Sequence, residues 1–179
     1  MKREALLRNV LFGMFFVLML VSFIFDREIL RFLGELFSWV FPSTVLQVMY
    51  YASHYGFFII VVAISGYLLR DKKKVVSFLF GIASIYVVGA VLKLLVQRVR
   101  PLGSGLETFS FPSGHVAVYF FIFAFMAGHD RKYKLIFLML AVLVSISRIY
   151  LGVHYLSDVS GGALLGVGMY LLFKRWIKV

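Results

Sequence analysis

The stretch SRIYLGVHYLSD, residues 147–158, places an arginine, a histidine and an aspartate between two apolar runs. Charged side chains are scarce elsewhere, because 62% of the 179 residues are hydrophobic and only 15% are charged. This composition is typical of an integral membrane protein. The flanking apolar runs, residues 135–146 and 159–173, are shorter than the roughly 20 residues of a spanning helix. They reach that length only by including the polar residues, which are therefore predicted to lie at helix ends near one membrane interface.

Working outward from this stretch, the chain shows further apolar runs bounded by polar residues, and together they predict six membrane-spanning helices. The predicted spans cover residues 10–25, 46–69, 75–96, 113–127, 135–148 and 154–173. Residues 29–41 place apolar side chains at helical spacing beside charged ones, which predicts an amphipathic helix at the interface. We therefore expect an all-α integral membrane bundle in which residues 1–179 form a single domain. The chain contains no cysteine, which excludes disulfides and thiolate chemistry.

Basic residues are distributed unevenly over the connecting segments. With six spans, the N-terminus, the loops at residues 70–74 and 131–134 and the C-terminus share one side and carry 13 of the 19 Lys and Arg residues. This bias predicts that the side is cytoplasmic. The net charge of +11 comes from short clusters beside apolar runs, without the continuous basic stripe typical of nucleic-acid binding. We therefore expect the bilayer and its anionic lipids as partners, and no nucleic acid.

Three separated segments are predicted to meet at the opposite, periplasmic face. They are KLLVQRVRP (93–101), FPSGH (111–115) and the stretch at 147–158. Ionisable groups within a membrane domain are energetically costly and by default indicate a functional site. Each segment alone has an ordinary explanation, since cations can anchor a helix at the interface, a serine can cap a helix, and a histidine and an aspartate four residues apart can stabilise one. Their predicted convergence favours a site instead.

The residue types in these segments suit phosphoryl transfer, which requires charge neutralisation, a nucleophile and an acid. The segments supply three cations that could hold phosphate oxygens, namely Lys93, Arg100 and Arg148. A helix start at Ser113 and Gly114 offers unpaired N–H groups to an anion. Asp158 could bind one imidazole nitrogen of His154 and leave the other free to attack, with His115 nearby. Two histidines and an aspartate could also bind a metal, but three adjacent cations would oppose its charge, so a metal ranks below phosphate.

The series K-x6-R-P (93–101), P-S-G-H (112–115) and S-R-x5-H-x3-D (147–158) resembles the three-part signature of the type 2 phosphatidic acid phosphatase superfamily. No signature position departs from the pattern. The resemblance implies a phosphatase that uses no metal or other cofactor and forms a phosphohistidine. It implies His154 as the nucleophile, Asp158 as its orienting partner, and His115 as the acid for the leaving oxygen and the base for water. The phosphate-binding residues that it implies are Lys93, Arg100, Ser113, Gly114 and Arg148.

The predicted depth of the site, in a protein with little mass outside the membrane, favours a phosphorylated lipid as substrate. Similar small bacterial family members act on lipid A 1-phosphate, undecaprenyl diphosphate or phosphatidylglycerophosphate, and the compact form here resembles the first two types. We expect a bacterial inner-membrane protein, and the Lys and Arg bias predicts that both termini are cytoplasmic and the site is periplasmic. A lipid phosphotransferase using the same intermediate, or a non-enzymatic anion or lipid transporter, are the alternatives. The sequence does not indicate an oligomeric state.

Three further polar residues have no assigned role. His54 is interpreted as a histidine at the membrane interface, near the outer end of the second predicted span. Arg98 suits either an interface anchor or the rim of the site. Glu107 is interpreted as a solvated carboxylate in the connector at residues 102–110.

Overall fold

The computed structural model of the chain describes residues 2–52, 54–101 and 108–177. Within these ranges the backbone forms seven α-helices and one short 3-10 helix, and no strand. The helices are α1 (Lys2–Val40), α2 (Ser43–Ala52), α3 (Tyr55–Leu69), α4 (Lys72–Val96), α5 (Gly114–His129), η1 (Arg131–Tyr133), α6 (Lys134–Tyr150) and α7 (Leu156–Ile177). The all-α architecture expected from the sequence is therefore confirmed for the described residues.

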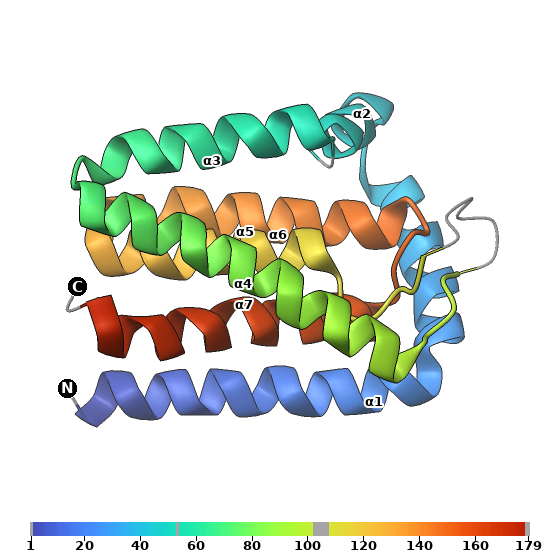
Figure 1. Cartoon of the computed structure of the whole chain (residues 1–179). Coiled ribbons are helices and arrows are strands. Elements are labelled where there is room, and N and C mark those ends of the chain that lie inside the picture. Colours follow the sequence, from blue (N-terminus) through green and yellow to red (C-terminus); the bar gives the residue numbers. More distant parts are fainter. Residues whose placement is uncertain (1, 53, 102–107, 178–179) are drawn as a thin grey trace.

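Helix α5 lies at the centre of the bundle and contacts α3, α4, α6 and α7 (Figure 1). Its side chains are apolar around the whole circumference, and every residue from 116 to 122 is buried. Such a helix is expected in the core rather than on the surface. Aromatic rings fill the space beside it, with the ring centroids of Phe78 and Phe121 6.0 Å apart and those of Phe121 and Phe125 5.7 Å apart.

Helix α1 bends at Phe25, whose backbone angles (φ −114°, ψ 20°) are not helical. Its first part runs alongside α7, and its second part crosses one end of the bundle (Figure 1). In the second part, one apolar stripe packs on the core and a second one is exposed, together with charged residues between them. The packed stripe is Leu30, Leu33 and Phe37, and the exposed stripe is Phe32, Leu36 and Trp39. The amphipathic helix predicted for residues 29–41 is present as this second part of α1.

Not all of the predicted spans exist as single long helices. Among the described residues, three helical segments are long and apolar enough to cross a membrane: Lys72–Val96, Arg131–Tyr150 and Leu156–Lys174. Helices α3 and α5 are apolar but shorter. The prediction of one continuous span over residues 46–69 is wrong, because this region forms two separate helices, α2 and α3. His54 is the extended N-cap of α3 there, and its Nδ1 accepts a hydrogen bond from the Gly56 N–H at 3.3 Å.

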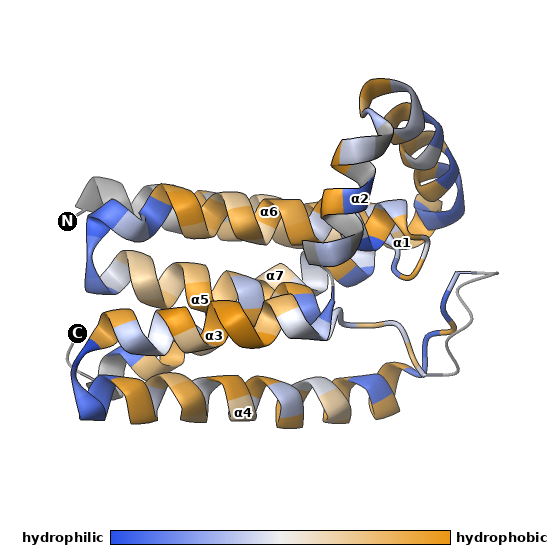
Figure 2. Cartoon of the chain, turned by 90° about the horizontal axis from the view of Figure 1, so that it is seen from above, coloured by the Kyte–Doolittle hydropathy of each residue, from blue (hydrophilic) through white to orange (hydrophobic). Residues whose placement is uncertain are grey.

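The polar segments gather at the two ends of the bundle. Both termini and the turns that join α3 to α4 and α5 to α6 lie at one end, where Figure 2 shows a strongly hydrophilic α3–α4 turn (Figure 2). Asp71 forms the N-cap of α4 in that turn by accepting hydrogen bonds from the N–H groups of Lys73 and Lys74. The other end holds the C-terminus of α4, the start of α5 and the connection between α6 and α7. The three segments predicted to converge therefore do so.

Candidate active site

The first segment includes the last turn of helix α4 and the chain that follows it. The helix ends at Val96, and Gln97 adopts a left-handed conformation (φ 48°) while its N–H donates to the Lys93 carbonyl. The predicted span over residues 75–96 also ends at Val96, and Arg100 lies in the chain beyond the helix. Lys93, on the last helical turn, donates through Nζ to the Phe109 carbonyl.

Arg100 is held by several acceptors at the mouth of the site. Its Nε donates to the Thr108 carbonyl at 2.8 Å, and its Nη1 donates to the Val153 carbonyl at 2.7 Å. The same Nη1 lies 3.1 Å from His154 Nε2. Lys93 and Arg100 are also close enough to repel each other electrostatically. Two neighbouring cations of this kind create a local positive potential that favours an anion between them.

The second segment starts helix α5 with groups that are free to bind an anion. Ser113 is the N-cap residue by position, yet its side chain makes no capping hydrogen bond, and its buried Oγ has no partner among the residues that the structure describes. The helix then begins at Gly114, where backbone N–H groups point out of the helix end. The ordinary capping role considered for Ser113 is thus not observed. His115 follows on the first turn, with its ring centroid 5.2 Å from that of Tyr55.

The third segment brings Arg148, His154 and Asp158 together. Arg148 lies on the last turn of α6, as predicted, and its carbonyl accepts the His154 N–H at 3.3 Å. His154 does not lie on α7 as expected, because that helix begins two residues later at Leu156. The predicted hydrogen bond is nevertheless present, with His154 Nδ1 3.3 Å from Asp158 Oδ2. Both side chains are buried. Burial lowers the pKa of His154 to about 4, although the hydrogen bond that the imidazole makes to the Asp158 carboxylate raises it.

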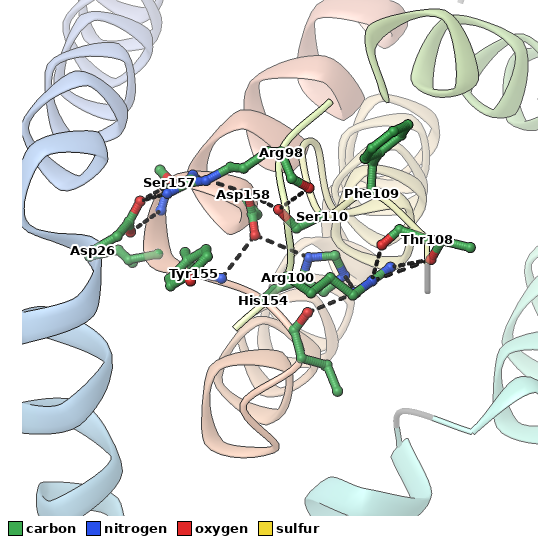
Figure 3. A network of polar contacts seen from close by, with 12 residues as sticks. Asp26, Arg98, Arg100, Thr108, Phe109, Ser110, His154, Tyr155, Ser157 and Asp158 are labelled. Atoms are coloured by element: carbon green, nitrogen blue, oxygen red, sulfur yellow. Dashed lines mark hydrogen bonds and ion pairs between the residues drawn. The ribbon is translucent and has the colours of Figure 1, made fainter. Parts of the chain in front are cut away.

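Hydrogen bonds join the three segments into one site (Figure 3). The Ser113 N–H donates to the Asp158 carbonyl at 3.0 Å, the Ser110 N–H donates to the Arg98 carbonyl at 2.8 Å, and Ser110 Oγ lies 3.3 Å from Asp158 Oδ1. His115 is close enough to Arg148, His154 and Arg100 to interact electrostatically with all three. All eight residues singled out from the sequence therefore lie at one end of the bundle, on segments that contact one another.

The structure also reveals residues that the sequence did not single out. Asp26, at the bend of α1, is 4% exposed and forms an ion pair with Arg98, which in turn reaches Asp158 Oδ1 at 3.2 Å. Arg98 is thus neither a free anchor nor a rim residue. A lone acidic residue at the end of the first apolar run was the available signal for Asp26, but it does not identify the partner. His54 caps α3, as described above, and Glu107 lies outside the described residues.

The described part of the chain contains no group of three or more His, Asp or Glu side chains arranged to hold a metal ion. Near the start of α5, His115 interacts electrostatically with two arginines, Arg100 and Arg148, and with His154. This donor set fits an anion with several acceptor oxygens, such as phosphate.

Comparisons with known proteins give a consistent family. The sequence model described as the PAP2 superfamily matches residues 74–179, more than half of the chain. Phosphatidylglycerophosphatase B of Bacillus subtilis is 42% identical over 98 residues, which is 47% of this chain and 48% of that protein. Undecaprenyl-diphosphatase of Sulfolobus acidocaldarius is 29% identical over 137 residues, which is 69% of this chain and 66% of that protein. The chain thus spans about half of the first relative and about two thirds of the second.

One solved structure extends the likeness to nearly the whole chain. The crystal structure of the first transmembrane PAP2-type phosphatidylglycerolphosphate phosphatase from Bacillus subtilis superimposes with a TM-score of 0.73 at 28% sequence identity, covering 95% of each chain. The likeness therefore includes α1 to α3, which precede the region matched by the family model.

Proposed function

Because this chain belongs to the PAP2 superfamily, we propose that it hydrolyses a phosphate monoester or a terminal phosphate of a membrane lipid through a phosphohistidine on His154. The observation that carries this proposal is the geometry around the imidazole. Nδ1 faces the Asp158 carboxylate, and Nε2 faces the Arg100 guanidinium. The carboxylate selects the tautomer with the proton on Nδ1, which leaves the Nε2 lone pair available for attack.

In the first step, His154 Nε2 attacks phosphorus, an N–P bond forms, and the bond from phosphorus to the lipid oxygen breaks. His115 gives a proton to that oxygen as it leaves. In the second step, His115 takes a proton from a water molecule that attacks phosphorus, the N–P bond breaks, and inorganic phosphate departs. Asp158 stabilises the positive charge that develops on His154 in the first step, because its carboxylate lies 3.3 Å from Nδ1.

The phosphate oxygens are bound by the cations and donors around this imidazole. Lys93, Arg100 and Arg148 neutralise the negative charge, and the Ser113 hydroxyl and the Gly114 N–H supply neutral donors. The unpartnered, buried Ser113 Oγ supports this assignment, because a buried hydroxyl without a partner is costly unless a ligand provides one. None of these roles requires a metal, so we expect activity in the presence of a chelator.

We propose a lipid as substrate because the site lies at the end of a bundle whose outward-facing side chains are largely apolar. Phosphatidylglycerophosphate and undecaprenyl diphosphate are favoured by the relatives named for them. Lipid A 1-phosphate, which the sequence placed with undecaprenyl diphosphate at the head of the candidates, remains a third possibility. We further propose six spans in a bacterial inner membrane, with both termini cytoplasmic and the site periplasmic, since the basic turns share the end where the termini lie.

The test is phosphate release by the detergent-purified full chain in EDTA, with the three lipids offered separately. Wild type is compared with His154→Ala and with the matched variant His129→Ala, whose histidine lies at the opposite end of the bundle. We expect release by wild type and His129→Ala and none by His154→Ala. Product analysis with an added lipid acceptor separates hydrolysis from transfer to a second lipid. Absence of release from every lipid by folded wild type would contradict the proposal and favour transfer or transport.

A further inference from the structure

Two charged residues that are largely shielded from solvent at this end of the bundle have no part in the reaction described above. Asp26 lies at the bend of α1 and is 4% exposed, and Arg98 lies in the chain after α4 and is 15% exposed. Removing a carboxylate and a guanidinium from water costs several kcal/mol per ion unless each is well paired. Their retention here therefore calls for a role. We propose that Asp26 and Arg98 are positioning residues that fix the Asp158 carboxylate for its contact with His154, an inference that rests on the proposed function.

The first step in the argument is the way in which Arg98 is held (Figure 3). Its Nη2 pairs with Asp26 Oδ2, while its Nη1 donates to Ser157 Oγ and to Asp158 Oδ1. The guanidinium carbon also lies 4.3 Å from the centroid of the Phe23 ring and 4.4 Å from that of the Tyr155 ring. The two aromatic rings that contact the guanidinium and the acceptors at its edge together restrict the guanidinium to one orientation.

The second step concerns how the two oxygens of Asp158 are occupied. Oδ1 receives hydrogen bonds from Arg98 Nη1 at 3.2 Å and from Ser110 Oγ at 3.3 Å. Oδ2 accepts a hydrogen bond from the Tyr155 N–H at 2.9 Å and lies 3.3 Å from His154 Nδ1. The two oxygens thus have separate tasks, because Arg98 binds the one that His154 does not use. A carboxylate held in this way cannot rotate away from the imidazole.

The third step explains why Asp26 is needed as well as Arg98. A free guanidinium binds a carboxylate most strongly through two parallel N–H donors. Such a pairing with Asp158 would occupy Oδ2 and compete with His154. Asp26 prevents it by engaging Nη2, so that only Nη1 reaches Asp158. Asp26 also accepts from the Ser157 hydroxyl at 2.5 Å and from the Ser157 N–H at 3.3 Å, which ties the bend of α1 to the start of α7.

The test uses Asp26→Asn, which keeps the shape of the side chain and removes its charge, with Asp26→Glu as the conservative variant. Asp130→Asn is the matched control, because Asp130 forms an exposed ion pair with Lys132 at the other end of the bundle. We expect Asp26→Asn to lower kcat by roughly 10- to 100-fold, by analogy with the loss of an outer-shell partner that orients a metal-binding histidine. KM should change by less than about threefold, because substrate contacts are kept. Asp26→Glu should recover more of kcat than Asp26→Asn.

A second readout does not depend on activity. The chain has four histidines, so the imidazole signals of 15N-histidine-labelled protein can be assigned from single His→Ala variants. We expect wild-type His154 to carry its proton on Nδ1, and Asp26→Asn to shift that signal or to mix the two tautomers, while Asp130→Asn leaves it unchanged. If Asp26→Asn does not fold, Arg98→Lys, which keeps the charge but cannot reach both carboxylates, is expected to give the same two results.

The outcomes separate the two proposals. An unchanged kcat and an unchanged His154 signal in a folded Asp26 or Arg98 variant would overturn the positioning role. A loss of stability with kcat and the His154 signal intact would likewise reduce the network to a structural tie between α1 and α7. A shifted His154 signal in the variants, combined with no phosphate release by wild type, would support the positioning role and overturn only the proposed hydrolase function.

Discussion

Arg100 Nη1 lies 3.1 Å from His154 Nε2, so a fixed positive charge faces the nitrogen that is opposite the Asp158 contact. This charge disfavours the protonated imidazole, and in the proposed mechanism it attracts a phosphate oxygen to the point where Nε2 can reach phosphorus. Arg100 is kept there by the carbonyls of Thr108 and Val153 on its two sides. Val153 directly precedes His154, so the backbone that carries the proposed nucleophile also helps to hold the cation.

Replacement of Arg100 by lysine is expected to lower kcat/KM even though the charge is kept. Lysine lacks the planar fork that contacts Thr108, Val153 and His154 together, so one charge-assisted hydrogen bond or more is lost. We expect a decrease of roughly 10- to 150-fold, which corresponds to about 1.5–3 kcal/mol for a hydrogen bond to a charged group. Arg70→Lys, at the opposite end of the bundle, is the control. Equal phosphate release by Arg100→Lys and wild type would show that the reaction does not require the planar guanidinium of Arg100.

Asp158→Asn is expected to reduce kcat far more than it raises KM. The amide cannot fix the Nδ1–H tautomer or stabilise the positive charge on His154, and in serine protease triads the equivalent change lowers kcat by about 10⁴. Steady-state rates of Asp158→Asn, compared with those of Asp71→Asn, give the measurement. Asp71 caps α4, and asparagine caps a helix about as well, so that variant should behave as wild type. A fall in affinity with kcat preserved would assign Asp158 to substrate binding instead.

The acid limb of the pH–rate profile should lie well below the ordinary histidine range. Attack requires neutral His154, and burial lowers the pKa of this group to about 4. The neutral form is present above that value, so the rate should fall only as pH decreases toward about 4. Asp158 raises the pKa of His154 against the effect of burial. The residual activity of Asp158→Asn should therefore have its acid limb at a still lower pH than wild type. An acid limb near 6.5 in the wild type would contradict the assignment of His154 as a buried nucleophile.

The sequence predicted the parts of the fold that depend on local chemistry. The apolar run after Ser113 and the polar ends of the last two spans located α5, α6 and α7 to within a few residues. The prediction failed at His54 because average hydropathy does not register a single cap. There, His54 is the N-cap of a new helix, α3, and its side chain accepts a hydrogen bond from the Gly56 N–H. The end of the third predicted span at residue 96 agrees with α4, whose last residue, Val96, is followed by Gln97 in a left-handed conformation.

The site residues were predictable because motif spacing places them, whereas their supporting residues depend on packing. Asp26 is separated from Arg98 by 72 positions and from Ser157 by 131. Only the packing of α1 against α7 brings these residues together, and a single sequence carries no signal for that contact. The role of Arg98 could not be assigned for the same reason, since a lone arginine at a membrane interface usually anchors the helix.

Gly166 and Gly168 offer a matched test of how closely α7 packs on α5. A Cβ at Gly166 would strike the Ala117 carbonyl oxygen and lie 2.9 Å from the Phe121 nitrogen, whereas a Cβ at Gly168 has nothing within 4 Å. The clash involves the backbone of α5, which cannot move aside as a flexible side chain can. We expect Gly166→Ala to destabilise the protein by about 1–3 kcal/mol, as overpacking does in a tight core. Gly168→Ala should be neutral, or stabilising by up to about 1 kcal/mol, because alanine favours the helix.

Thermal unfolding of the two variants in the same detergent measures the difference. Because Ser113, a proposed phosphate ligand, is the N-cap of α5 and α7 carries Asp158, a separation of these helices at Gly166 should also weaken the 3.0 Å hydrogen bond between the Ser113 N–H and the Asp158 carbonyl. Gly166→Ala is therefore expected to lose activity at temperatures where it is still folded, and Gly168→Ala is not. Equal melting temperatures for the two variants would mean that α7 can shift away from α5 without cost, and that the site is positioned by its own hydrogen bonds rather than by this helix contact.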